Sequence, residues 1–285
     1  MEDLSFSLER QIAIATRYAH KPLAGQKALV TGANSGIGEA ISRYLAAAGA
    51  SVVINYIRNP ESAQAIADQI NQAGGEAITA YADVSKESEV IAMFDQSIKA
   101  FGTLDIVVAN AGLEQNAPIA EMTEAQWDLV MDVNVKGQFF CAREAIKEFR
   151  RRGIKPETSV SLGKIICMSS VHDFIPWAGH VNYAASKAAI LMMMKSLAQE
   201  VSRDGIRVNA ISPGAIKTPI NRPAWETDVA REKLFELIPY NRVGVVDDVA
   251  KLAIYLASDE SDYIVGQTVT IDGGMCVMEA FAFGG

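Results

Sequence analysis

Short apolar runs alternate with longer amphipathic stretches along the chain from residue 27 onward. The apolar runs are rich in valine, isoleucine and alanine and are bounded by turn residues, as is typical of strands buried on both faces. The stretches between them repeat apolar residues every three or four positions, which indicates helices. This alternation predicts βαβ units, in which parallel strands form one sheet and helices cover both of its faces.

The boundaries of these elements follow from glycine, proline and polar capping residues. Strands are predicted at 27–31, 51–56, 76–82, 104–109, 164–168, 206–211 and 267–271. Helices are predicted from the first strand's turn to residue 48 and at 60–73, 86–101, 124–151, 183–203 and 247–257. The fold class is therefore α/β: a single Rossmann-type, doubly wound domain with a seven-stranded, mostly parallel sheet.

Three segments stand apart from this alternation. Residues 1–24 precede the first strand as an N-terminal arm, which we expect to pack on the domain at 25–285 or on a neighbouring subunit. Residues 153–163 join a helix to the next strand and are expected at the amino ends of the strands. Residues 218–246 follow the sixth strand at its carboxyl end, where they could close over a ligand as a substrate lid.

Composition and charge exclude several classes of protein. The formal net charge of −8 argues against a nucleic-acid partner, and no apolar run reaches the roughly 18 residues of a membrane span. The N-terminus lacks the order of a signal peptide, and the three cysteines are far apart, so we expect a cytoplasmic protein with reduced thiols. His20, His172 and His180 are scattered along the chain, so no metal is expected.

A glycine-rich turn, TGANSGIG, joins the first strand to its helix. Gly32, Gly36 and Gly38 would let the backbone approach a pyrophosphate, and the helix amino terminus would offer free N–H groups and a positive dipole. The spacing GxxxGxG differs from the commoner GxGxxG. Its place between a strand and an amphipathic helix nevertheless favours a dinucleotide site over an ordinary turn. The other candidate residues of this turn are Asn34, Ser35 and Ile37.

The end of the second strand bears on the choice between NAD and NADP. An acidic residue there would bind the ribose 2′-hydroxyl of NAD, but this chain has Asn55, Tyr56 and Arg58 at that place and no acid before Glu61. Arg58 could pair with the 2′-phosphate of NADP, or it could be a solvated loop arginine. We therefore expect NADP to be accepted, with NAD as a second cofactor.

Candidate acid/base chemistry lies between Ser169 and Lys187. Ser170 follows the fifth strand at the sheet edge where open α/β folds bind ligands. Tyr183 and Lys187 are four residues apart at the start of a helix, so their side chains share one face. A neighbouring cation favours the phenolate, so we expect a lowered phenol pKa and a tyrosine that exchanges a proton near neutral pH. Taken alone, this spacing also arises by chance in ordinary helices.

Several motifs, taken in order, resemble those of the short-chain dehydrogenases/reductases, and the resemblance covers residues 24–285. They are the glycine-rich turn, NAG at 110–112, Asn134, Ser170 and YAASK at 183–187, with Asp83-Val84, Pro213-Gly214 and DGG at 272–274. Within that family, NAGLEQNAP at 110–118, MSSVHDFIPW at 168–177 and HVNYAASK at 180–187 are most similar to the bacterial glucose 1-dehydrogenases. The N-terminal arm and residues 153–163 depart from those enzymes.

The resemblance implies a role for each matching catalytic residue. Tyr183 would be the general acid/base, and Ser170 would hydrogen-bond the substrate oxygen. Lys187 would hold the nicotinamide ribose and lower the pKa of the phenol. Asn134 would anchor a water that leads protons outward from Lys187, although a lone asparagine in a helix is more often a packing residue.

The resemblance also implies the remaining cofactor contacts. Asp83 and Val84 would meet the adenine, although Asp83 could equally cap the following helix. The adenosine-ribose side would be lined by Asn110, Ala111 and Gly112, and the carboxamide and phosphates would lie near Ile216 and Thr218, after Pro213 and Gly214.

Substrate residues are expected on loops at the same sheet edge. Glu114 and His172 are the candidates beside Ser170 and Tyr183. The resemblance implies oxidation of a small sugar, β-D-glucose, at C1 to glucono-lactone with NAD(P), in a homotetramer whose apolar tail at 278–283 packs across a subunit boundary. A reductase of a 3-oxoacyl thioester or small ketone would share every catalytic residue, and a non-catalytic NAD(P)-binding protein is the alternative from another class.

Overall fold

The apolar runs form one parallel sheet in the computed structural model, which describes residues 6–277. The sheet has seven strands in the order β3-β2-β1-β4-β5-β6-β9, and every pairing is parallel. The strands are β1 Lys27–Val30, β2 Ser51–Tyr56, β3 Glu76–Tyr81, β4 Ile106–Ala109, β5 Gly163–Met168, β6 Ile206–Pro213 and β9 Thr268–Ile271. The predicted doubly wound α/β fold is confirmed. The strand order reverses between β1 and β4, where such sheets form a ligand crevice at their carboxyl ends.

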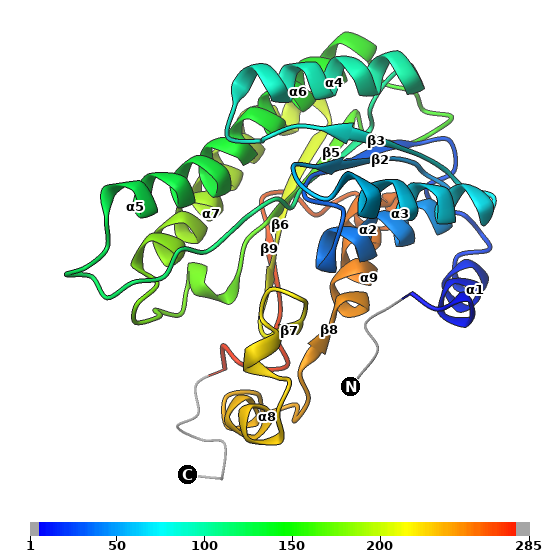
Figure 1. The fold of residues 1–285 in the computed structure, drawn as a ribbon. Helices are drawn as coiled ribbons and strands as arrows, with labels where there is room; N and C mark the ends of the chain where they lie inside the picture. The colour runs from blue at the N-terminus through cyan, green and yellow to red at the C-terminus, as the bar shows by residue number, and fades with distance from the viewer. Residues whose placement is uncertain (1–5, 278–285) are drawn as a thin grey trace.

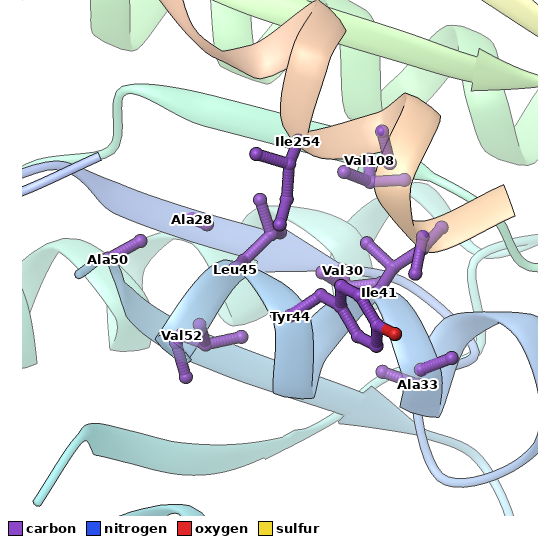
Figure 2. Packing of buried hydrophobic residues seen from close by; sticks show 14 of the residues in the cluster. Ala28, Val30, Ala33, Ile41, Tyr44, Leu45, Ala50, Val52, Val108 and Ile254 are labelled. Carbon is purple, nitrogen blue, oxygen red and sulfur yellow. The ribbon is translucent and has the colours of Figure 1, made fainter. Parts of the chain in front are cut away.

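Helices cover both faces of the sheet and create two apolar cores (Figure 1). One face carries α2 Gly36–Ala47, α3 Pro60–Gln72 and α9 Val246–Ala257. The other carries α4 Glu87–Phe101, α6 Gly137–Arg152 and α7 Val181–Val201. Successive strand residues point to opposite faces, so Ala28 and Val30 of β1 pack in the first core and Leu29 in the second. Figure 2 shows the first core, where Leu45 of α2 and Ile254 of α9 join the side chains of β1.

The segment predicted as a single helix at 124–151 is divided into three parts. It forms α5 Glu124–Met131, a π-helical turn η1 at Asp132–Lys136, and α6. The predicted helix is therefore present over nearly the expected range, but it is not α-helical throughout. A π-helical turn adds one residue to the local ring of hydrogen bonds, and such turns often occur at functional sites.

The N-terminal arm carries helix α1 Leu8–Arg17, which lies beside α2 (Figure 1). Ile14 of α1 is buried in the first core. Arg10 pairs with Asp247 at the start of α9 through contacts of 2.5 and 3.2 Å. The arm therefore contacts two helices of the same face of the sheet.

The segment after β6 leaves the carboxyl edge of the sheet and returns to it. Its ends are joined by two short parallel strands, β7 Ile216–Lys217 and β8 Gly244–Val245, and helix α8 Asp228–Phe235 lies beyond them (Figure 1). Within residues 6–277, none of the helices combines the length and apolar character needed to span a bilayer. The apolar tail expected at a subunit boundary lies outside the described residues.

Candidate active site

The glycine-rich turn forms a tight cradle between β1 and α2. Gly32 and Gly36 have φ values of 59° and 57°, which favour glycine. A Cβ on Gly38 would collide with the carbonyl oxygen of Gly32 and would lie 2.6 Å from the Asn110 amide nitrogen. The side chain of Ser35 makes no capping hydrogen bond to α2. The first turn of α2 therefore has no side-chain cap on its backbone amides, which with the positive end of the helix dipole are available to an anion.

Two asparagines, the buried Asn55 and the partly buried Asn110, hold this cradle in place. The Asn110 amide donates to the carbonyl oxygens of Thr31 and Gly32 at 2.9 and 3.2 Å. The Asn55 side chain accepts from the Gly32 N–H at 3.0 Å and donates to the carbonyl oxygens of Ala80 and Ala82 at 3.2 Å each. Both side chains thus bond to the protein backbone, so they shape the site rather than project into it.

The expected adenosine end lies at the carboxyl edges of β2 and β3. Arg58 is exposed, and its carbonyl oxygen accepts from the Asn34 side chain at 2.8 Å, so the arginine adjoins the glycine-rich turn. Tyr56 packs edge-on against Tyr81 with ring centroids 6.0 Å apart. Asp83 accepts from the backbone N–H and the hydroxyl of Ser85 at 3.0 and 2.7 Å, so it stabilises the turn before α4 and does not cap that helix, whose N-cap residue is Lys86. Val84, the next residue, packs against Gly137 at the start of α6.

On the other side of the cradle, the segment after β6 closes against the glycine-rich turn. A Cβ on Gly36 would lie 3.5 Å from the Thr218 methyl group. Asn221 holds Thr218 by accepting from its N–H at 3.0 Å and its hydroxyl at 2.8 Å. Ile216 is buried, and a Cβ on Gly214 would be 2.8 Å from the Asp272 side chain, so little freedom remains here. Pro213, which ends β6, is buried beside them.

The structure brings Ser170, Tyr183 and Lys187 together at the carboxyl end of β5. Ser170 lies close enough to the Tyr183 phenol to lower its pKa. The Lys187 ammonium nitrogen lies 5.4 Å from the centre of the Tyr183 ring and donates to the Met168 carbonyl oxygen at 3.0 Å. A Cβ on Gly112 would lie 3.6 Å from that nitrogen, so the loop at 110–112 forms the opposite wall.

The pKa values of this pair are set by burial. Burial raises the pKa of the Tyr183 phenol to about 12, and the nearby Ser170 lowers it only in part. Burial also lowers the pKa of Lys187 to about 8. The prediction that Lys187 lowers the phenol pKa is wrong for this arrangement, because loss of solvent outweighs the other influences on a phenol that is buried this deeply.

Asn134 lies on the π-helical turn and is completely buried, at 0% exposure. Its side chain accepts from the Leu113 N–H at 2.8 Å and donates to the Leu113 carbonyl oxygen and the Ser186 hydroxyl at 3.0 Å each. These bonds tie the loop after β4 to α7 one residue before Lys187. The role of Asn134 in anchoring a proton-carrying water stays a prediction.

The substrate side contains a stack of three rings that the sequence did not predict. The indole of Trp177 is stacked on His172 at 4.3 Å and 19°, and on His180 at 3.5 Å and 4°. Two rings parallel to one indole at these distances would overlap if they shared a face, so one imidazole covers each face. Tyr183 is edge-on to the indole at 6.4 Å. The sequence indicated only where these rings would lie, because the loop between Ser170 and Tyr183 must lie at this sheet edge. It did not indicate that they would stack.

Glu114 lies at the mouth of the same site. Its carboxylate is 3.8 Å from the His180 Nε2 and accepts from the Asn116 side chain at 3.3 Å. Its charge acts on both Tyr183 and Lys187 and raises the pKa of each. Within the described residues, no cluster of three or more histidine, cysteine, aspartate or glutamate side chains is arranged to hold a metal ion.

Comparisons with known proteins agree with this geometry. Residues 32–276 match the family model described as Enoyl-(Acyl carrier protein) reductase. The 3beta-hydroxysteroid dehydrogenase 1 of Eggerthella lenta is 43% identical over 92% of this chain and 98% of that protein. Glucose 1-dehydrogenase 2 of Bacillus subtilis is 39% identical over 90% of this chain and 96% of that protein. A gluconate 5-dehydrogenase from Burkholderia cenocepacia, solved with NADP and tartrate, has 34% identity and a TM-score of 0.84, covering 92% of this chain and 99% of that one.

Proposed function

Because the chain belongs to the short-chain dehydrogenase/reductase family and is an NAD(P)-dependent oxidoreductase, we propose that it oxidises β-D-glucose at C1 to glucono-lactone. The glycine-rich turn supports a dinucleotide in the crevice, since a side chain on Gly38 would disrupt the close packing of the turn against Asn110. When bound, the nicotinamide supplies the acceptor for the hydride that leaves C1.

The observation that carries the sugar assignment is the polar lining beside Tyr183. Glu114 offers a carboxylate that can accept sugar hydroxyls, and its charge reaches both Tyr183 and Lys187. His172 and His180 stack on Trp177, which keeps 41% of its surface exposed, so this wall presents imidazole nitrogens beside the indole. Polar groups of this kind favour a substrate that carries several hydroxyls.

In the proposed mechanism, Ser170, Tyr183 and Lys187 act at the reacting end of the substrate. Ser170 donates a hydrogen bond to the reacting oxygen, and Tyr183 in its phenolate form removes the hydroxyl proton as the C1–H bond breaks. Lys187 offers a donor for the nicotinamide ribose, and below its pKa of about 8 it also adds positive charge beside Tyr183. The products are the lactone carbonyl, a protonated Tyr183 and the reduced cofactor, so charge and protons balance.

The raised pKa of Tyr183 sets the expected pH dependence. At neutral pH the phenol is protonated, because its pKa is about 12. Oxidation needs the deprotonated form and should become faster as the pH rises, whereas reduction uses the protonated phenol as it stands. We expect Tyr183→Phe to lower kcat in both directions by about 10²–10⁴-fold.

An alcohol on an apolar ring system is the second candidate substrate. Phe174, in the loop that follows Ser170, is 79% exposed and offers an aromatic surface next to the site. The relative from Eggerthella lenta carries the name of a hydroxysteroid dehydrogenase. This candidate uses the same Tyr183, Ser170 and Lys187, so the lining residues must distinguish the two.

A substrate panel tests the proposal. The wild-type chain is assayed with glucose, gluconate, a 3-hydroxysteroid, a 3-oxoacyl thioester and a small ketone, each with NAD and NADP. We expect glucose turnover, and Glu114→Gln should reduce kcat/KM for glucose by about 10–100-fold through loss of a charged hydrogen bond. Glu121→Gln, which changes an exposed acid further along the same loop, is the matched control and should change nothing. Turnover of the steroid or ketone without turnover of glucose would reject the sugar assignment.

We also infer a homotetramer. Met192 on the outer side of α7 is 63% exposed, and Trp127 and Leu129 of α5 expose apolar surface as well. Exposed apolar side chains on neighbouring helices favour burial against another subunit. Sedimentation analysis of the wild-type chain measures the oligomeric state directly, and a monomer at micromolar concentration would exclude this inference.

A further inference from the structure

We propose that Asp173 is a positioning residue of this site, which fastens the turn carrying Ser170 to β5 and β6 and places a fixed negative charge behind Tyr183 and Lys187. The inference rests on the proposed acid/base role of Tyr183 but not on the identity of the substrate. Asp173 lies in the stretch MSSVHDFIPW at 168–177, to which the sequence analysis assigned no role for this residue.

The carboxylate of Asp173 connects the ends of two strands through hydrogen bonds. Asp173 lies in η2, a 3₁₀ turn at Val171–Asp173. One oxygen, Oδ2, accepts from the hydroxyl of Ser169 at 2.8 Å and from the hydroxyl of Ser212 at 2.5 Å. Ser169 follows β5 and Ser212 belongs to β6, and both are buried. Because a carboxylate bonded to two buried hydroxyls is costly to displace, the turn is held at the end of both strands.

This connection determines where Ser170 lies. Ser170 caps η2, its hydroxyl oxygen accepts from the His172 N–H at 3.3 Å, and its carbonyl oxygen accepts from the Asp173 N–H at 2.9 Å. The Ser169 hydroxyl also lies 3.3 Å from the carbonyl oxygen of Lys187. Asp173 is therefore linked through one serine to the backbone of α7 and through its own turn to Ser170.

The charge of Asp173 reaches both members of the acid/base pair. The ionisable groups around that pair are Glu114 from the loop after β4, Cys167 from β5, and His172 and Asp173 from η2. Asp173 and Glu114 raise the pKa of Tyr183 and also that of Lys187, where they oppose the effect of burial. The charge of Asp173 also acts on Cys276, whose backbone N–H donates to Asp272 at 2.7 Å. Removing the negative charge at 173 should therefore make Tyr183 easier to deprotonate.

Two substitutions separate position from charge. Asp173→Asn keeps an oxygen that can accept from both serines but removes the charge, whereas Asp173→Ala removes both. Asp259→Asn is the matched control, since Asp259 likewise accepts a serine hydroxyl, that of Ser159 at 2.6 Å, in a 3₁₀ turn at the opposite edge of the sheet.

The test is the pH profile of kcat/KM for oxidation, measured with the best substrate of the panel and saturating cofactor. We expect Asp173→Asn to move the rising limb to lower pH by about one pH unit, with Asp259→Asn unchanged. Asp173→Ala should lower kcat by about 10–100-fold, because Ser170 is no longer held at the substrate oxygen. The proposal is overturned if Asp173→Asn shifts the limb no more than the control, or if Asp173→Ala retains kcat. Absence of glucose turnover by the wild-type chain would reject only the proposed substrate.

Discussion

At the scale of single residues, several polar side chains at this sheet edge support the site by binding the backbone. The side-chain amides of Asn55 and Asn110 donate hydrogen bonds to carbonyl oxygens of the cradle and of its neighbouring strands. Arg58 differs, because its side chain is exposed at the end of the cradle while only its backbone is bonded to Asn34. We propose that the exposed charge of Arg58 takes part in the choice between NAD and NADP.

We therefore predict that Arg58→Ala raises KM for NADP by about 10–100-fold, the value of one charge-assisted contact with a phosphate. KM for NAD should change by less than about threefold, since NAD has no 2′-phosphate to lose that contact. Steady-state kinetics with each cofactor measure the ratio of KM for NADP to KM for NAD. Arg150→Ala, which removes an exposed arginine paired with Asp204, serves as the control. An unchanged cofactor ratio would mean that Arg58 is a solvated loop residue.

At the scale of elements, the π-helical turn η1 connects the cofactor side of the site to helix α7. It places Asn134 where its amide pairs with both backbone groups of Leu113 and with Ser186. An uninterrupted α-helix through 124–151 would carry this side chain to a different angle around the helix axis. The irregular turn is therefore part of how the loop at 110–114 is held against the acid/base pair.

Replacing Asn134 tests this role of the turn. We expect Asn134→Ala to destabilise the fold by about 2–4 kcal/mol, because buried groups of Leu113 lose their partners. Activity should also fall, as the wall opposite Lys187 loosens. Thr123→Ala, which removes the capping box of α5, should cost about 1 kcal/mol and leave kcat unchanged. Urea unfolding and kcat measured on the same samples distinguish the two. Equal kcat values for both variants would show that the turn serves stability alone.

At the scale of the whole molecule, the N-terminal arm and the segment after β6 meet at the start of α9. Arg10 of the arm binds Asp247, and Arg242 from the segment after β6 binds the adjacent Asp248 at 2.7 Å. The Tyr44 phenol of α2 also hydrogen-bonds Asp247, and burial together with this acid raises its pKa. The first turn of α9 thus joins the arm, α2 and the base of the segment that we expect to act as a lid.

The arm should therefore contribute stability through this contact. Arg10 and Asp247 are 24% and 19% exposed, so solvent screens the pair in part, and we predict that Arg10→Ala costs about 1 kcal/mol. For a chain of this size that corresponds to a fall in Tm of about 2–4 °C. Arg17→Ala, in the exposed last turn of α1, is the control. A double-mutant cycle with Asp247→Asn isolates the pair, and a coupling energy of zero would exclude it.

The sequence by itself determined the features that depend on local pattern. These features are the alternation of strands and helices, the glycine-rich turn and the shared helical face of Tyr183 and Lys187. Each of them depends on residues that are close together in the sequence. The strand ends then placed Ser170 and the loop at 110–112 at the same edge, because parallel strands align their carboxyl ends. For this reason the catalytic and cofactor candidates could be predicted from the sequence.

Only the tertiary structure decided how those groups behave. The pKa of Tyr183 is raised because packing removes solvent from a residue whose sequence neighbours suggested the opposite. Asp173 and Ser212 are 39 positions apart, and Arg10 and Asp247 are 237 apart, so neither contact leaves a signal in local sequence. The imidazole–indole stack and the π-helical turn likewise depend on which surfaces meet after folding. Desolvation and long-range contact are properties of the packed chain, which is why they were beyond the reach of pattern and spacing.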